Sequence, residues 1–151
     1  MVHERDGRRV VAGDATGFPA TLALVDALPD ALRDEIAVSL RAAGARFAFL
    51  HGSRAAGTHR EGSDVDVAAW WGGGAPHSWE VELPSDVDLL VLDGAPLLLA
   101  GRVAMHGLLL LDDDPPARVR WTATTRKVYV DELPRMRRAD DDFKRSVLRG
   151  R

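Results

Sequence analysis

The chain has 151 residues, a hydrophobic fraction of 46% and a formal net charge of −3 at pH 7. These values predict one folded domain with an apolar core and no general attraction to nucleic acid or anionic membranes. The absence of cysteine excludes disulfides, a thiolate nucleophile and a cysteine-ligated zinc site. The apolar runs are far shorter than the roughly 20 residues that span a bilayer, so we expect a soluble, cytoplasmic protein.

The N-terminal part differs in character from the rest of the chain. Residues 1–18 contain several glycines and little periodicity, so we expect an irregular segment there. Residues 19–151 are expected to form a single domain that ends in helices, and Pro19 suits the first turn of a helix.

The clearest predicted helix covers residues 30–43. Leu32, Ile36 and Leu40 recur at helical spacing, and Gly44 follows where a left-handed C-terminal cap is expected. The remaining elements are expected as strands at 45–50, 64–71, 86–92 and 108–111, an edge strand at 79–83, a break at 72–74, and helices at 96–105, from 117 onward and near 131–148.

Two charged segments have a plain interpretation. We interpret the carboxylates at residues 112–114 as a solvated turn, because adjacent side chains seldom converge on one ion; a metal site is the alternative. The basic residues at 135–138 and 144–145 alternate with acidic residues at 140–142, which is typical of a solvated helix face. The alternative is contact with an acidic partner surface or with RNA that the partner holds.

The chemistry is carried by two motifs. Ten residues separate Gly52-Ser53 from the Asp64-Val65-Asp66 motif, and Asp88 lies at the start of the third strand. Side chains alternate along a strand, so Asp64 and Asp66 should share a face, about 7 Å apart, which Asp88 can reach from its own strand. Three carboxylates on one sheet suit Mg²⁺, and two such ions can clamp the attacking and leaving oxygens of a phosphoryl transfer.

The residues around Gly52 suit a phosphate. A glycine lets the backbone approach a ligand closely, and the amide and hydroxyl of Ser53 can donate to phosphate oxygens; Ser53 could equally be a helix N-cap. Arg54 and Arg60 lie in the following loop and could touch a triphosphate. His51 is interpreted as a packed strand-end histidine rather than a catalyst.

The Gly-Ser and Asp-x-Asp spacing, with a later aspartate strand, resembles the signature of the polymerase-β-like nucleotidyltransferase superfamily. The strings at residues 52–57, 63–67 and 87–92 look like its minimal single-domain branch, the MNT-type proteins encoded beside HEPN-domain toxins. The resemblance covers roughly residues 30–135.

This resemblance implies an α/β (α+β) fold with a mixed sheet flanked by helices, and Mg²⁺-dependent transfer of AMP from ATP to a tyrosine of a HEPN ribonuclease toxin. The protein would be the antitoxin in a hetero-oligomer, with no direct contact to nucleic acid or membrane. Asp64, Asp66 and Asp88 would be catalytic residues and ligands of two Mg²⁺ ions, and Asp88 a candidate to accept the proton of the acceptor. The implied nucleotide-binding residues are Gly52, Ser53, Arg54 and Ser63.

Alternatives remain at the third carboxylate and in the connection before it. Asp86 and Asp93 compete with Asp88, which we favour because it directly precedes the apolar core of its strand. Only residues 67–87 separate the acidic strands, where this branch usually has a helix. We therefore expect either a strand-like segment there or an open side of the pocket.

Other questions concern the tryptophans and the function itself. Trp70 and Trp71 should face opposite ways, one in the core and the other toward a partner or a base. A stand-alone transferase for a small molecule such as an aminoglycoside is one rival, although such enzymes usually carry an additional helical domain. A non-catalytic antitoxin that neutralises its partner by binding is the other.

Overall fold

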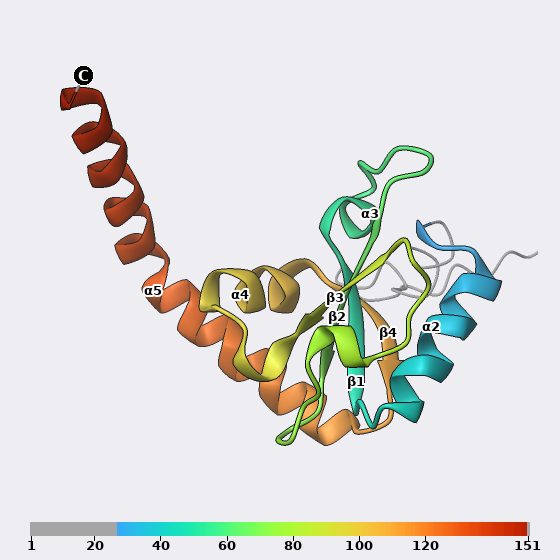
Figure 1. Ribbon diagram of the computed structural model, residues 1–151. Helices are drawn as coiled ribbons and strands as arrows, with labels where there is room; N and C mark the ends of the chain where they lie inside the picture. The colour runs from blue at the N-terminus through green and yellow to red at the C-terminus, as the bar shows by residue number, and fades with distance from the viewer. Residues whose placement is uncertain (1–26, 151) are drawn as a thin grey trace, which may run out of the picture.

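The computed structural model describes residues 27–150, so the expectations for residues 1–18 and for Pro19 lie outside the described part. The elements are α2 (Asp30–Ala42), β1 (Phe47–His51), α3 (Gly52–Ala56), β2 (Val65–Trp70), the 3₁₀ turn η1 (Ser78–Glu80), β3 (Val87–Val91), the 3₁₀ turn η2 (Leu92–Gly94), α4 (Leu97–His106), β4 (Leu108–Asp112) and α5 (Pro115–Arg149). The strands form one mixed sheet in the order β3-β2-β1-β4 (Figure 1). β1 is antiparallel to β2 and β4, whereas β2 and β3 are parallel. The expected mixed sheet with flanking helices is confirmed.

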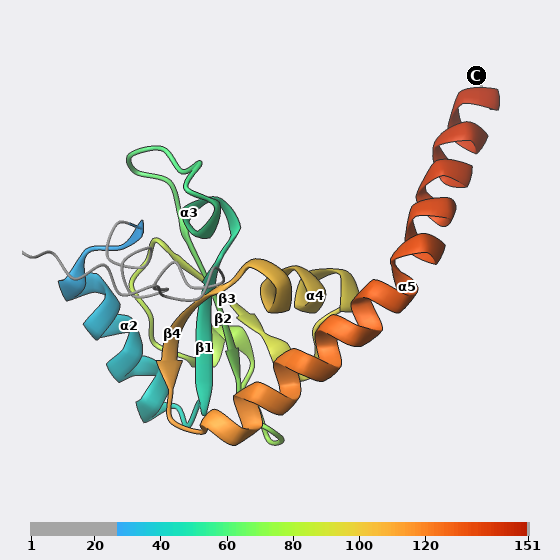
Figure 2. The same ribbon diagram turned by 180° about the vertical axis from the view of Figure 1, so that it is seen from behind.

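Each face of the sheet carries an apolar layer. Along β2, Val67 belongs to the cluster beneath α2, where Leu40 is fully buried. Ala68 points to the opposite face, into the cluster that contains Val103 of α4. α2 therefore covers one face, while α4 and the first part of α5 cover the other (Figures 1 and 2). Because side chains alternate along a strand, Asp66 shares the α4/α5 face with Ala68.

The regular elements follow the sequence periodicity closely. α2 ends at Ala42, and Gly44 has φ +88 with its amide donating to the carbonyl of Arg41, so the predicted helix and its left-handed cap are confirmed. The strands predicted at 45–50, 64–71, 86–92 and 108–111 and the helix predicted at 96–105 are each found with ends within two residues of the predicted ones.

The connection from β2 to β3 differs from the prediction. The edge strand expected at residues 79–83 is wrong, because a 3₁₀ turn occupies this part of the chain. The ring of Trp79 stacks on that of His77 with centroids 4.3 Å apart, and the Glu80 carboxylate accepts a hydrogen bond from the His77 amide at 2.6 Å. These contacts stabilise a compact turn instead of an extended strand.

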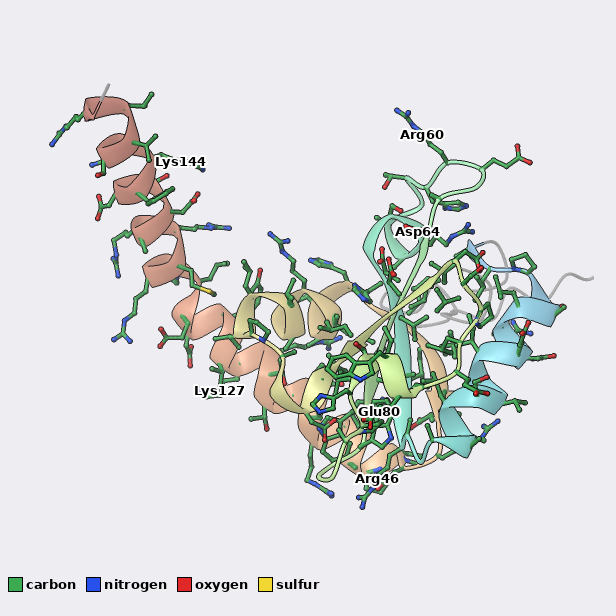
Figure 3. All side chains as sticks on the ribbon, in the orientation of Figure 1. Arg46, Arg60, Asp64, Glu80, Lys127 and Lys144 are labelled. Carbon is green, nitrogen blue, oxygen red and sulfur yellow. The ribbon has the colours of Figure 1, made fainter. Side chains whose placement is uncertain are left out.

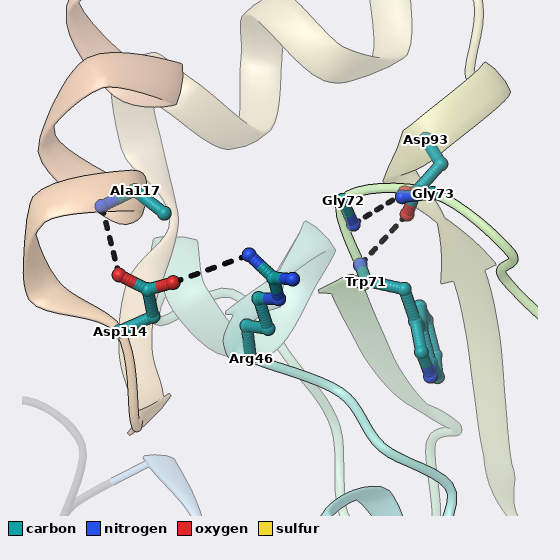
Figure 4. A network of polar contacts seen from close by, with 7 residues as sticks. All are labelled: Arg46, Trp71, Gly72, Gly73, Asp93, Asp114 and Ala117. Carbon is teal, nitrogen blue, oxygen red and sulfur yellow. Dashed lines mark hydrogen bonds and ion pairs between the residues drawn. The ribbon is translucent and has the colours of Figure 1, made fainter.

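The glycine break at the end of β2 is fixed by one carboxylate. Gly72, Gly73 and Gly74 all have positive φ, so the chain turns sharply here. The Asp93 side chain accepts hydrogen bonds from the amides of Trp71 at 2.8 Å, Gly72 at 2.7 Å and Gly73 at 3.0 Å (Figure 4). Asp93 therefore has a structural role and lies just beyond the end of β3, whereas Asp88 lies at the start of that strand.

The acidic run at residues 112–114 is joined to arginines of neighbouring elements. Asp114 also caps α5, because its side chain accepts from the Ala117 amide at 3.1 Å (Figure 4). The turn is thus partly exposed, as expected for a solvated segment, but held by ion pairs. These pairs are Arg118 Nε–Asp112 at 2.9 Å, Arg41 Nε–Asp113 at 2.7 Å and Arg46 Nη1–Asp114 at 3.4 Å.

α5 is a single helix of 35 residues rather than the two predicted segments, and it contains Pro134. Its second half extends away from the sheet (Figures 1 and 2). There Lys144 pairs with Asp140, and Arg145 pairs with Asp142 at 3.7 Å, which agrees with a solvated helix face. Among residues 27–150 no helix combines the length and the apolarity that crossing a membrane requires.

Candidate functional site

The sheet aligns the predicted site residues in a row across three strands. Asp66 of β2 is paired in register with Asp88 of β3, and His51 of β1 is paired with Asp66 on the other side. Neighbouring strands lie about 4.8 Å apart, so Asp66 and Asp88 are brought next to each other on one face. Asp64 precedes β2 by one residue and lies beside α3 at the same end of the sheet (Figure 3).

The carboxylates are gathered at one end of the sheet without closing around a common point. Asp64 and Asp88 are exposed and Asp66 is half-buried. Within residues 27–150 no three His, Asp or Glu side chains lie close enough together to share one metal ion. The expected trio therefore lies at one end of the sheet, spread over β2, β3 and the residue before β2, and its side chains would have to turn inward to hold a cation.

The turn after β1 is shaped around Asp66. Gly52 has φ +69, a left-handed conformation that side-chain-bearing residues rarely adopt. A Cβ atom at this position would overlap the carboxylate of Asp66. Only glycine satisfies both requirements, so the Gly-Ser motif and the Asp-x-Asp motif are fitted to each other through this contact.

The other predicted nucleotide-binding residues lie around α3. The N-cap of α3 is His51, so the alternative that Ser53 is the cap is wrong; Ser53 lies in the first turn. Arg54 donates to the carbonyl oxygens of Ala27 at 3.3 Å and of Ser63 at 2.9 Å. In this arrangement Arg54 holds the loop between α3 and β2 closed.

Two further side chains of this loop differ in exposure. The Ser63 hydroxyl oxygen is buried without a hydrogen-bond partner among the described residues. Arg60 is exposed and extends from the tip of the loop into solvent (Figure 3). The expected contacts of both residues with a nucleotide stay predictions.

His51 is a half-buried residue at the end of β1, as the sequence predicted. Burial lowers the pKa of its imidazole below the usual value, because the charged form loses hydration. The negative charge of Asp66 and a hydrogen bond involving the Val67 backbone act in the opposite direction. The imidazole is thus biased toward the neutral form beside Asp66.

Sequence reasoning missed a hollow that adjoins the Gly-Ser turn. We call it the α3–α4 hollow; its volume is about 380 Å³. The only signal in the sequence is that Arg102 and His106 are four residues apart, on one face of α4, whereas Tyr129 comes from α5, far along the chain. The α3–α4 hollow is lined by His51, Gly52, Ala55, Ala56, Leu99, Arg102, His106 and Tyr129.

The two adjacent tryptophans point to opposite faces of the sheet, as predicted, but both pack against apolar clusters, whereas one was expected to face a partner or a base. Trp71 is buried and its indole nitrogen donates to the Ala43 carbonyl at 2.9 Å. Trp70 stacks on Phe47 with centroids 5.0 Å apart. Both tryptophans lie at the C-terminal end of β2, whereas Asp64 precedes its N-terminal end. Neither tryptophan therefore belongs to the carboxylate end of the sheet.

Comparison with known proteins gives a consistent result. A profile of the family described as "Polymerase beta, Nucleotidyltransferase" matches residues 35–116, more than half of the chain. Comparison with curated proteins gave no significant match.

Similar solved structures come from toxin–antitoxin complexes. A chain of a toxin–antitoxin complex with AMP-PNP is 25% identical, with a TM-score of 0.62, covering 74% of this chain and 98% of that one. A chain of an MntA–HepT complex is 22% identical, with a TM-score of 0.58 and coverages of 75% and 97%. A chain of the complex of a tri-AMPylated Shewanella oneidensis HEPN toxin with an MNT antitoxin is 22% identical, with a TM-score of 0.60 and coverages of 77% and 99%. With the aspartate row and the Gly-Ser turn in place, the chain belongs to the polymerase β nucleotidyltransferase family.

Proposed function

We propose that this protein is a Mg²⁺-dependent nucleotidyltransferase that transfers AMP from ATP to a tyrosine hydroxyl of a HEPN-type toxin and thereby acts as its antitoxin. The observation that carries the proposal is the in-register pair Asp66–Asp88 beside a glycine turn that leaves room for the Asp66 carboxylate. Residues that only pack the fold would not require such a fit.

The donor set suits magnesium. Asp64, Asp66 and Asp88 offer hard carboxylate oxygens from one end of the sheet, and Gly52 forms a cradle that a Cβ would fill. When bound there, Mg²⁺ would neutralise the phosphate charge that develops during transfer. Two ions are expected, as for other phosphoryl transfers of this kind.

The nucleotide has room on the β1 side of the carboxylates. The amides of Gly52 and Ser53 and the Ser53 hydroxyl can donate to phosphate oxygens. The α3–α4 hollow, at about 380 Å³, is in the range of small-molecule pockets. Arg102 offers a cation and Tyr129 an aromatic ring for the remainder of ATP. Arg54 and Ser63 would act mainly by shaping the loop that borders this side.

The reaction itself needs little from the protein beyond positioning. The acceptor oxygen attacks the α-phosphorus of ATP, a new O–P bond forms, and the bond from the α-phosphorus to the bridging oxygen breaks. Pyrophosphate leaves with that electron pair, and the hydroxyl proton passes to the carboxylate of Asp88 or to water. Asp88 is exposed, so a hydroxyl from outside can reach it.

The relatives support the identity of donor and acceptor. The complex whose chain is 25% identical to this one contains AMP-PNP, an ATP analogue. The Shewanella oneidensis complex contains an AMPylated HEPN toxin.

The test is label transfer with purified components. The protein is incubated with Mg²⁺, ATP labelled at the α-phosphate and the HEPN protein encoded beside it. We expect labelled toxin with the wild type and at least a hundredfold slower labelling with Asp66→Asn or Asp88→Asn. Asp34→Asn, at an exposed carboxylate on α2, is the matched control and should label at the wild-type rate.

Two outcomes would contradict the proposal. If Asp66→Asn and Asp88→Asn transferred label as fast as the control, the carboxylates would not be catalytic. If the wild type bound the toxin and silenced it without transferring label, the protein would be an antitoxin that acts by binding alone.

A further inference from the structure

The basic residues are unevenly distributed along the chain. Residues 61–101, which form β2, the β2–β3 connection, β3 and most of the first half of α4, contain no lysine or arginine. In a chain with 20 basic residues, this segment is therefore acidic in sequence. Its acidic residues are Glu61, Asp64, Asp66, Glu80, Glu82, Asp86, Asp88 and Asp93.

A groove lies in this region along β3, the edge strand of the sheet. We call it the β3-edge groove; its volume is about 340 Å³. Asp88 lines it, and so does Trp79, whose surface is 79% exposed although its ring is held by stacking on His77. Its other lining residues are Ser78, Val81, Leu83, Pro84, Ser85, Val87 and Leu89.

The order of the strands indicates what should enter this groove. The row across the sheet runs from His51, next to the Gly-Ser turn, through Asp66 to Asp88 at the edge. In a phosphoryl transfer the attacking and leaving oxygens lie roughly in line on opposite sides of the phosphorus. If pyrophosphate leaves on the α3 side, the attacking hydroxyl must come from the β3 edge.

We propose that the β3-edge groove is the acceptor site, and that it binds a basic segment of the partner protein that presents the modified hydroxyl to Asp88. This inference rests on the proposed function and adds to it where the acceptor docks and what chemistry recognises it. Trp79 supplies an exposed aromatic face for an aromatic or arginine side chain of that segment. Glu82 and Asp86, both exposed, complement its positive charge.

The charge complementarity favours a protein segment with lysine or arginine near the hydroxyl over an acidic or neutral one. An acidic segment would be repelled by the exposed carboxylates of Glu82, Asp86 and Asp88, and none of the residues that line the β3-edge groove is basic. Exposed tryptophans are also enriched at the centres of protein interfaces, where a large rigid ring gives contact area at little entropic cost. The distal part of α5 is the competing surface, with Phe143 exposed.

The experiment measures partner affinity and transfer separately. Binding of the HEPN protein is measured by calorimetry without ATP, nucleotide binding is measured with a non-hydrolysable ATP analogue and Mg²⁺, and transfer is measured with labelled ATP. The variants are Trp79→Ala, Glu82→Lys and, as a matched exposed aromatic outside the groove, Phe143→Ala.

We expect Trp79→Ala and Glu82→Lys to weaken partner binding at least tenfold and to raise the KM for the partner equally, with nucleotide affinity unchanged. Phe143→Ala should behave as the wild type. Wild-type partner affinity in Trp79→Ala and Glu82→Lys would overturn the inference, and a loss confined to Phe143→Ala would assign docking to α5 instead. A wild type that transfers no label would refute the proposed activity, while the binding measurement would still decide where the partner docks.

Discussion

At the scale of single residues, the site depends on a position that has no side chain. Gly52 combines a positive φ with a close approach to Asp66, and these are two separate reasons for glycine. The first is a property of the backbone and the second a property of the site. Gly57 has a positive φ but no close approach to another side chain, so comparing it with Gly52 separates backbone strain from the contact with Asp66.

We expect Gly52→Ala to abolish transfer, because its methyl group would push the Asp66 carboxylate out of the row. Gly57→Ala is the matched control: Gly57 also has a positive φ, +72, but a Cβ there meets nothing within 4 Å. Both changes should cost about 1–2 kcal/mol of unfolding free energy through left-handed strain. Chemical denaturation and label transfer measure the two effects.

The comparison has a clear contrary result. If Gly57→Ala lost as much activity as Gly52→Ala at equal stability, backbone strain alone would explain the loss, and the fit between Gly52 and Asp66 would have no catalytic importance.

At the scale of elements, α4 and α5 meet at one tight contact. A Cβ at Gly101 of α4 would overlap the ring of Tyr129 of α5, so glycine lets the two helices approach closely. Tyr129 also lines the α3–α4 hollow, which links the packing of these helices to the proposed nucleotide site. A substitution at Gly101 should therefore change both the stability of the helix packing and the binding of the nucleotide.

We expect Gly101→Ala to lower the unfolding free energy by about 1–3 kcal/mol through overpacking, although alanine favours a helix by up to about 1 kcal/mol over glycine. It should also weaken binding of an ATP analogue by displacing Tyr129. In the double variant with Tyr129→Ala the overlap is gone, so a double-mutant cycle measured in urea should show a favourable coupling of at least 0.5 kcal/mol. Additive effects of the two changes would contradict the contact.

The elements also show where sequence reasoning succeeds. The apolar spacing of α2 and the alternation in β2 depend on local patterns that packing on one face reinforces, so both were predicted to within a few residues. The carboxylate row was predicted from side-chain alternation along β2. Its register with β3 could not be predicted, because register depends on contacts between distant segments.

The failures have physical causes of the same kind. The expected strand at 79–83 was wrong because the stacking of Trp79 on His77 and a hydrogen bond to Glu80 outweigh β-propensity. The break expected between two C-terminal helices was wrong because Pro134 is accommodated inside α5. The α3–α4 hollow was missed because its walls come from four elements, β1, α3, α4 and α5.

At the scale of the whole molecule, the carboxylate row lies between two hollows of the surface. On the β1 side lie the Gly-Ser turn and the α3–α4 hollow, to which α4 contributes Arg102. On the β3 side lies the β3-edge groove, none of whose lining residues is basic. The proposed transfer uses both hollows, with the anionic donor on the β1 side and a basic segment of the acceptor protein on the β3 side.

The central claim is that Asp66 and its neighbours hold a divalent cation together with the nucleotide. Mn²⁺, used in place of Mg²⁺, reports this directly through its electron paramagnetic resonance signal when titrated with a non-hydrolysable ATP analogue. We expect the wild type and the control Asp34→Asn to bind the Mn²⁺–nucleotide complex equally, and Asp66→Asn to bind it at least tenfold more weakly. Equal affinity in all three proteins would contradict the account.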